Sequence, residues 1–127
     1  MDKKRILVVD DEQGFTRLLK MALSGYEIRE VNDPSLALDV AREFRPDLML
    51  LDVVMPDLDG GDLATQLQAE PTLANVPIIF VTAIVSPKEG ESERTIGGFP
   101  FIAKPVARDT LIRCIEAHLA TAAARAS

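Results

Sequence analysis

The stretch LMLLDVVMPDLDG, residues 48–60, joins an apolar run to a single charge and then to a turn. The four residues before Asp52 are all apolar, and an uninterrupted apolar run is typical of a strand covered on both faces. Pro56 has a fixed φ angle, and Gly60 and Gly61 permit the backbone angles of a turn into a following helix. Because a strand end is where a rigid sheet can present a reactive group, Asp52 is a candidate functional residue.

Two further apolar runs, ILVV at residues 6–9 and IIFV at residues 78–81, resemble the first and predict two other central strands. Edge strands are expected where the pattern differs. Residues 27–31 alternate polar with apolar side chains, and residues 99–103 contain Pro100, whose missing N–H is tolerated mainly at an edge. The predicted strands therefore cover residues 5–9, 27–31, 47–51, 76–81 and 99–103.

Amphipathic segments with helical spacing separate these strands, and such alternation is the pattern of an α/β protein. We predict one flavodoxin-like, doubly wound domain over residues 1–127, with five parallel strands in the order 2-1-3-4-5 and five helices. Asp33 before Pro34 predicts one capped helix start, and the capping box from Ser86 to Glu89 predicts another. Residues 120–127, ATAAARAS, are expected to form a frayed tail.

The composition excludes several classes of function. Twenty acidic and fourteen basic residues give a net charge of −6, which opposes attraction to nucleic acid and to anionic lipid. Direct DNA binding is therefore not expected. Membrane association is not expected either, because no segment approaches the roughly 18 apolar residues of a membrane span. The one cysteine, Cys114, cannot form a disulfide within the chain, so we expect a cytoplasmic protein.

Polar residues follow four of the predicted strands at one edge of the sheet. Asp10, Asp11 and Glu12 follow the first strand, Asp52 the third, Thr82 the fourth and Lys104 the fifth. Ligands of doubly wound sheets bind outside the carboxyl ends of the strands, so these side chains are expected to share one crevice.

Three carboxylates in one crevice repel one another unless a cation lies between them, and an all-oxygen set of ligands favours Mg²⁺. A zinc or copper site has no support, because His118 is the sole histidine and shares the last helix with Cys114. A carboxylate beside Mg²⁺ and a lysine can carry out phosphoryl transfer. Asp52 would attack phosphorus, the ion and Lys104 would neutralise the phosphoryl oxygens, and Thr82 would donate a hydrogen bond to them.

The motifs ILVVDDE, LLDVVMPDLDG, VTA and FIAKP resemble, in order and spacing, those of the receiver domains of two-component response regulators. The resemblance covers nearly the whole chain and is of the single-domain, chemotaxis-regulator kind. It implies that Asp52 is the phosphoacceptor. It also implies that Asp10, Asp11 and Asp52 bind Mg²⁺ together with the backbone carbonyl of Val54.

The resemblance assigns roles at the other strand ends as well. Thr82 is implied to be the switch hydroxyl, Lys104 the lysine that pairs with the phosphoryl group, and Phe101 the switch aromatic residue. The peptide bond before Pro105 is implied to be cis. Phe101 stands where the family often has Tyr, so a signal that needs the phenolic hydroxyl is not expected here.

Two apolar residues bear on how long a phosphoryl group would last. By the resemblance, Val54 and Ile84 flank the path of the water that attacks the acyl phosphate. Neither side chain can orient a water molecule, so we predict slow self-dephosphorylation.

The implied function is a phosphorylation-controlled signalling switch rather than an enzyme, promoting only its own phosphorylation and slow dephosphorylation. The phosphoryl donor would be a sensor histidine kinase or a histidine phosphotransfer protein. Phosphorylation would change the surface around the fourth helix, fifth strand and fifth helix, and so alter binding of a downstream protein target. A monomer or weak homodimer is expected.

The fourth helix of the family falls in residues 86–98 of this chain. This segment contains Gly90, Gly97 and Gly98, and Ile96 is its only apolar residue. Helices in proteins are stabilised mainly by packing an apolar face, so we predict a short, shifted or mobile helix that orders on phosphorylation or partner binding.

Two other classes of function remain open from the residues. A hydrolase with an aspartyl-phosphate intermediate would need an Asp as general acid two residues after the nucleophile, where this chain has Val54. A binding module that keeps only the fold would be expected to have lost the acidic pair, the acceptor or the lysine, and this chain has all of them.

Overall fold

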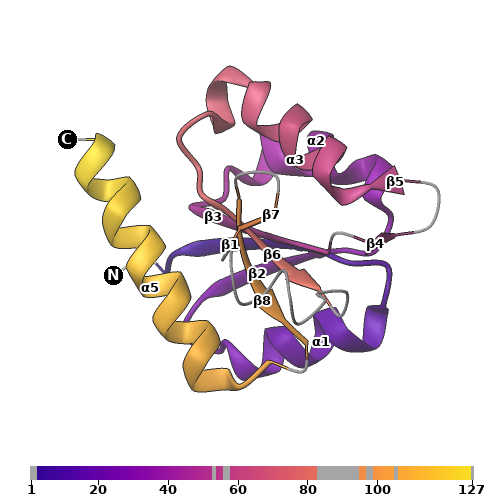
Figure 1. Ribbon diagram of the computed structural model, residues 1–127, viewed down its shortest axis with the longest axis vertical. Coiled ribbons are helices and arrows are strands. Elements are labelled where there is room, and N and C mark those ends of the chain that lie inside the picture. Colours follow the sequence, from indigo (N-terminus) through magenta and orange to yellow (C-terminus); the bar gives the residue numbers. More distant parts are fainter. Residues whose placement is uncertain are drawn as a thin grey trace.

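The computed structural model of the chain has one main sheet with helices on both of its faces (Figure 1). It describes residues 3–52, 54–55, 58–82, 95–96, 99–104 and 106–126, and at 54–55, 58–60, 82, 95–96 and 125–126 the description covers the backbone. Among the helices of these residues, none has the length and hydropathy that crossing a bilayer requires.

The main sheet contains the five expected parallel strands. Their spatial order is β2-β1-β3-β6-β8, which confirms the predicted order 2-1-3-4-5. Three of the five have the predicted bounds, and the other two differ by one or two residues at their ends. The strands are β1 (Arg5–Val9), β2 (Glu27–Val31), β3 (Leu48–Leu51), β6 (Ile78–Thr82) and β8 (Phe99–Ala103).

The prediction that residues 99–103 form an edge of the sheet was wrong. A two-residue strand, β7 (Thr95–Ile96), pairs antiparallel with β8 on its outer side. Pro100 removes one N–H from β8, but its carbonyl and the groups of its neighbours can still pair, so a short strand can be added there. A second unexpected pairing joins β4 (Val54–Met55) to β5 (Leu58–Asp59) as a small antiparallel sheet before the third helix.

Four α-helices lie in the described residues. The expected fourth helix, in residues 86–98, falls outside them except at Thr95–Ile96, which form β7, so its predicted mobility and the capping box at its start stay untested. Asp33 caps the 3₁₀ turn that leads into α2, because its Oδ1 accepts a hydrogen bond from Ser35 N at 3.1 Å. The helices are α1 (Gln13–Ala22), α2 (Ala37–Phe44), α3 (Gly60–Ala69) and α5 (Arg108–Ala126), with 3₁₀ turns η1 (Pro34–Leu36) and η2 (Pro71–Leu73).

The two faces of the sheet are covered by different pairs of helices (Figure 1). Helices α2 and α3 cover one face and α1 and α5 the other, and successive strand residues alternate between these two cores. The buried strand residues on the α2 and α3 side are Leu7, Val9, Val31, Met49, Leu51, Ile78 and Phe80. Those on the α1 and α5 side are Ile6, Val8, Leu48, Leu50, Ile79 and Val81.

Helix α5 is held by its first half and extends past the sheet (Figure 1). Leu111 and Ile115 are buried against the strands, and Leu119 is partly buried. The helix continues to Ala126, and the fraying expected for residues 120–127 stays a prediction.

A tyrosine on the loop before β2 contacts α5. Burial is the first cause that raises the pKa of Tyr26, to about 12, and a hydrogen bond to Glu116 and the charge of that carboxylate raise it further. The neutral phenol is therefore favoured by the folded state. This contact fastens α5 to the start of β2.

Replacement of a central core residue should cost far more stability than replacement of an exposed residue of the same type. Leu50 in β3 is 1% exposed, and Leu50→Ala should lower the free energy of unfolding by about 2–5 kcal/mol because it leaves a cavity. Leu36 is 51% exposed, and Leu36→Ala should stay within about 0.5 kcal/mol. Urea unfolding measures both, and equal effects would contradict this core.

The tyrosine contact predicts a particular alkaline titration. The chain has one tyrosine and no tryptophan, so the ultraviolet absorbance of tyrosinate reports Tyr26 alone. The midpoint should be about 12 in the folded protein and about 10 in urea. The folded-state pKa is the higher of the two, so the contribution to stability is complete below pH about 10 and is lost as the pH rises through about 12.

Glu116→Gln should lower the midpoint in the folded protein, because it removes the carboxylate charge. Glu43→Gln, at an exposed position on α2, should leave it unchanged. Circular dichroism at each pH verifies that the protein is folded. A folded-state midpoint near 10 would contradict the contact.

Candidate functional site

The position of the site is set by the register of three neighbouring strands, β2, β1 and β3. Val9 in β1 is aligned with Val31 in β2 and with Leu51 in β3. The next residue of each strand therefore falls in one row across the sheet. This row consists of Asn32, Asp10 and Asp52.

Backbone hydrogen bonds continue the sheet into this row. The N–H of Asp52 donates to the carbonyl of Val9 at 3.0 Å, and that of Asp10 donates to Val31 at 3.1 Å. Asp10 and Asp52 are 1% and 6% exposed. Two carboxylates are thus held side by side, nearly out of solvent, by the backbone of the core strands.

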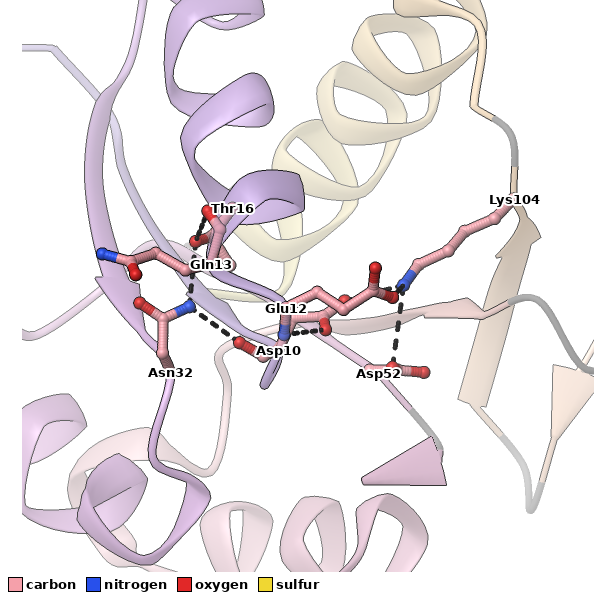
Figure 2. Close-up of polar contacts among 7 residues, drawn as sticks. All are labelled: Asp10, Glu12, Gln13, Thr16, Asn32, Asp52 and Lys104. Carbon is pink, nitrogen blue, oxygen red and sulfur yellow. Dashed lines mark hydrogen bonds and ion pairs between the residues drawn. The ribbon is translucent and has the colours of Figure 1, made fainter. Parts of the chain in front are cut away.

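The chain after β8 brings a cation to these carboxylates (Figure 2). Lys104 Nζ donates a hydrogen bond to Asp10 Oδ2 at 2.8 Å, and it lies 3.6 Å from Asp52 Oδ2 and 3.5 Å from Glu12 Oε1. Burial acts to lower the pKa of Lys104, but the hydrogen bond and charge of Asp10, followed by the charges of Asp52 and Glu12, outweigh it and raise the pKa. The lysine is therefore a permanent positive charge at neutral pH.

An aromatic ring covers the same ammonium group. Lys104 Nζ lies 4.1 Å from the centroid of the Phe15 ring on α1, and its side chain is 13% exposed. A cation over a ring face is attracted by the ring quadrupole, most strongly where water is excluded. Phe15 therefore helps to keep the lysine over the carboxylates.

The acidic residues form a set with the chemistry of a magnesium site. One carboxylate oxygen from each of Asp10, Asp11 and Asp52 lies within 4.8 Å of the other two. A hard divalent cation prefers oxygen ligands, and Mg²⁺ keeps several of its waters, for which the exposed Asp11 side leaves room. The described residues at this edge fit Mg²⁺ by their donor atoms and by their uncompensated negative charge.

The structure brings together four of the residues predicted from the sequence, namely Asp10, Asp11, Asp52 and Lys104. The backbone of Thr82 ends β6, and Thr82 is aligned with Ala103 in β8. The predictions for other residues stay untested.

Among these, Val54 is described by its backbone in β4, whereas Ile84 and Pro105 lie outside the described residues. Phe101 is partly buried on the α2 and α3 side, aligned with Phe80.

Glu12, which follows the first strand with Asp10 and Asp11, donates its backbone N–H to Asp10 Oδ1 at 2.9 Å. Two other contacting residues were not predicted from the sequence as part of the site: Asn32 contacts the backbone of Asp10, and Phe15 covers the lysine. Asn32 had a signal, because it follows a strand in the way that Asp10 and Asp52 do. Phe15 had none, because an aromatic residue at helical spacing is expected in a core.

The comparison with known proteins agrees with this fold and site. Residues 6–116 match the response regulator receiver domain, and the chain belongs to that family. A receiver domain is a signalling module of two-component systems and not a catalytic enzyme, as expected from the resemblance.

Individual relatives match over most of the chain. It is 32% identical over 121 residues to the polar-differentiation response regulator DivK of Brucella anthropi, covering 94% of this chain and 98% of DivK. It is 36% identical over 108 residues to the response regulator PleD of Caulobacter vibrioides, covering 80% of this chain and 23% of PleD. The solved structure of the Vibrio cholerae chemotaxis protein CheY4 superimposes with a TM-score of 0.78 at 25% identity, covering 90% of this chain and 97% of CheY4.

Removal of one acidic charge should have opposite effects with and without magnesium. Asp11→Asn reduces repulsion among the carboxylates, so without Mg²⁺ the free energy of unfolding should rise by up to about 1 kcal/mol. Mg²⁺ should raise the melting temperature of the wild type, since it binds the folded state, and should do so much less for the variant. Asp39→Asn, at an exposed site on α2, should keep the full Mg²⁺ response. An unchanged response in Asp11→Asn would exclude this residue from the metal site.

Proposed function

We propose that this chain is a phosphorylation-controlled switch that accepts a phosphoryl group on Asp52 from a phosphohistidine. Membership of the receiver family and the acidic pocket indicate phosphorylation-controlled signalling in general. The observation that carries the finer proposal is the placement of Asp52. This nearly buried carboxylate lies at a strand end, within 3.6 Å of a permanently charged lysine and beside two further carboxylates.

The proposed transfer is a single displacement at phosphorus. A carboxylate oxygen of Asp52 forms a bond to phosphorus while the bond from phosphorus to the imidazole nitrogen of the donor breaks, and the electron pair of that bond leaves with the imidazole. Lys104 attracts the phosphoryl oxygens from the side of β8. Asp10, Asp11, Asp52 and the carbonyl of Val54 would hold Mg²⁺, which when bound supplies positive charge against the phosphoryl oxygens.

The proposed donor is a sensor histidine kinase or a histidine phosphotransfer protein. A histidine kinase partner follows from the receiver family in general terms. The donor must approach the carboxyl end of the sheet, because Asp52, Lys104 and the acidic pair all lie there.

Phosphorylation would be read out at the other side of the pocket, by a downstream protein target. In the proposed switch, the hydroxyl of Thr82 turns toward the phosphoryl group and Phe101 rotates into the space that it leaves. Phe101 is partly buried against the α2 and α3 core, so inward rotation would bury more of its ring. The surface that changes would include the fourth helix, β8 and α5.

The hydrolase alternative has less support. It requires a general acid two residues after the nucleophile, and Val54 stands at that position. The alternative of a binding module without phosphorylation is also disfavoured, because a buried, paired Asp10 and a charged Lys104 are costly to keep together in an apolar fold without a chemical role.

The test is phosphorylation by a small donor. With acetyl phosphate and Mg²⁺, intact-mass spectrometry should show a gain of about 80 Da, the mass of one phosphoryl group. Asp52→Asn should abolish the gain, because an amide nitrogen or oxygen is a poor nucleophile, and Asp39→Asn should keep it. Chelation of Mg²⁺ should suppress it in the wild type. A phosphorylated Asp52→Asn protein would overturn the proposal.

The acyl phosphate is expected to be long-lived. Val54 and Ile84 are apolar at the two positions that are proposed to flank the attacking water, so neither can orient it. Val54→Asn or Ile84→Glu should therefore speed phosphoryl loss, by on the order of ten-fold for a polar group that assists the water. Loss is followed in purified protein after removal of the donor, with Leu36→Asn as a control at an exposed site. Unchanged rates in both variants would refute the water-access argument.

A further inference from the structure

A series of polar contacts lies beside the acidic pocket, on the side of Asp10 away from Lys104 (Figure 2). Asn32 Nδ2 lies 2.8 Å from the backbone carbonyl of Asp10 and 2.9 Å from Thr16 Oγ1. Thr16 Oγ1 lies 2.9 Å from Glu30 Oε1 and 3.1 Å from the carbonyl of Gln13. Thr16 is fully buried on α1, where a polar side chain is stable only if its hydroxyl is hydrogen-bonded.

The donor and the acceptor of each hydrogen bond in this series follow from the groups at its two ends, the carbonyl of Asp10 and the carboxylate of Glu30. The carbonyl of Asp10 can only accept, so the group of Asn32 that faces it is the NH₂ and not the amide oxygen. The second N–H of that NH₂ donates to Thr16 Oγ1. The hydroxyl proton of Thr16 then points onward, and the carboxylate of Glu30 is its closer acceptor.

These contacts hold Asp10 through every one of its polar groups. Its N–H donates to Val31, its carbonyl accepts from Asn32, its Oδ1 accepts from Glu12 N and its Oδ2 accepts from Lys104. The carbonyl of Asp10 belongs to the peptide that joins it to Asp11. Asn32 therefore fixes the plane of the peptide from which the Asp11 carboxylate projects.

We propose that Asn32 is a positioning residue for the Mg²⁺-binding carboxylates, and that Thr16 orients the amide of Asn32. The inference rests on the proposed function for the identity of the ion. Asn32 and Thr16 do not touch the ion or the phosphoryl group. They act through the peptide group between Asp10 and Asp11. The plane of this peptide has to keep one orientation if two adjacent carboxylates are to bind the same cation.

A residue that only anchors α1 to β2 would behave differently from a positioning residue. Loss of an anchor lowers the free energy of unfolding but leaves the Mg²⁺ affinity of the molecules that remain folded unchanged. Loss of a positioning contact weakens Mg²⁺ binding in fully folded protein. The Mg²⁺ dissociation constant, measured by calorimetry without any phosphoryl donor, distinguishes the two.

The experiment uses three variants and two matched controls. Asn32→Ala removes both N–H donors, and Thr16→Val removes the hydroxyl with little change of shape. Each should weaken Mg²⁺ binding about ten-fold, the lower end of what outer contacts to metal ligands contribute. Thr16→Ser keeps the hydroxyl and should restore affinity to within about two-fold of the wild type.

The controls are an exposed asparagine and an exposed helical threonine, Asn75→Ala and Thr121→Val, which should bind Mg²⁺ like the wild type. In acetyl phosphate assays the half-saturating Mg²⁺ concentration of Asn32→Ala should rise about ten-fold, while the phosphorylated fraction at saturating Mg²⁺ equals that of the wild type.

Wild-type Mg²⁺ affinity in folded Asn32→Ala and Thr16→Val would overturn the inference, even if both variants are less stable. A Thr16→Ser variant as weak as Thr16→Val would also overturn the role of the hydroxyl. If the wild type binds Mg²⁺ but is never phosphorylated, the proposed function fails, and the calorimetric comparison still decides the inference by itself.

Discussion

The register of β1 against β3 is the constraint on which the site depends. Val9 is aligned with Leu51, and the N–H of Asp52 donates to the carbonyl of Val9. A shift by one residue would turn every side chain of β3 to the other face and would separate Asp52 from Asp10. The buried residues of these two runs each contribute about 1.5–3 kcal/mol. Together they exceed the repulsion of a carboxylate pair, about 4 kcal/mol at 4 Å and an effective dielectric constant of 20.

The core thus holds charges together that would separate in solution, and Lys104 reduces the repulsion that remains. Its ammonium group lies against two buried carboxylates and under the ring of Phe15. One positive charge among Asp10, Asp11, Glu12 and Asp52 still leaves the pocket negative. The pocket is therefore complementary to a divalent cation, and a phosphoryl group, which is negative itself, would be accommodated best with that cation present.

The sequence predicted the three central strands well because their apolar runs are unbroken, and it predicted Asp10, Asp52 and Lys104 because each follows a predicted strand. It could not predict β7 or the pairing of β4 with β5. Strands of two residues have no period to detect, and their pairing depends on which chain lies alongside. Asn32 and Thr16 were missed for another reason. Thr16 interrupts the buried stripe of α1, and its partners on β2 are close only after the helix packs on the sheet.

Asp10 and Asp52 have the same side chain and nearly the same burial, yet their surroundings separate them. Both carboxylate oxygens of Asp10 accept hydrogen bonds, at 2.9 Å from Glu12 N and 2.8 Å from Lys104 Nζ. Asp52 lies farther from the same ammonium group, at 3.6 Å. A carboxylate held by short hydrogen bonds on both oxygens is a poor nucleophile, because attack would break one of them as the new bond forms. These contacts on both of its oxygens suit Asp10 to orient Lys104 and the neighbouring Asp11 rather than to attack phosphorus.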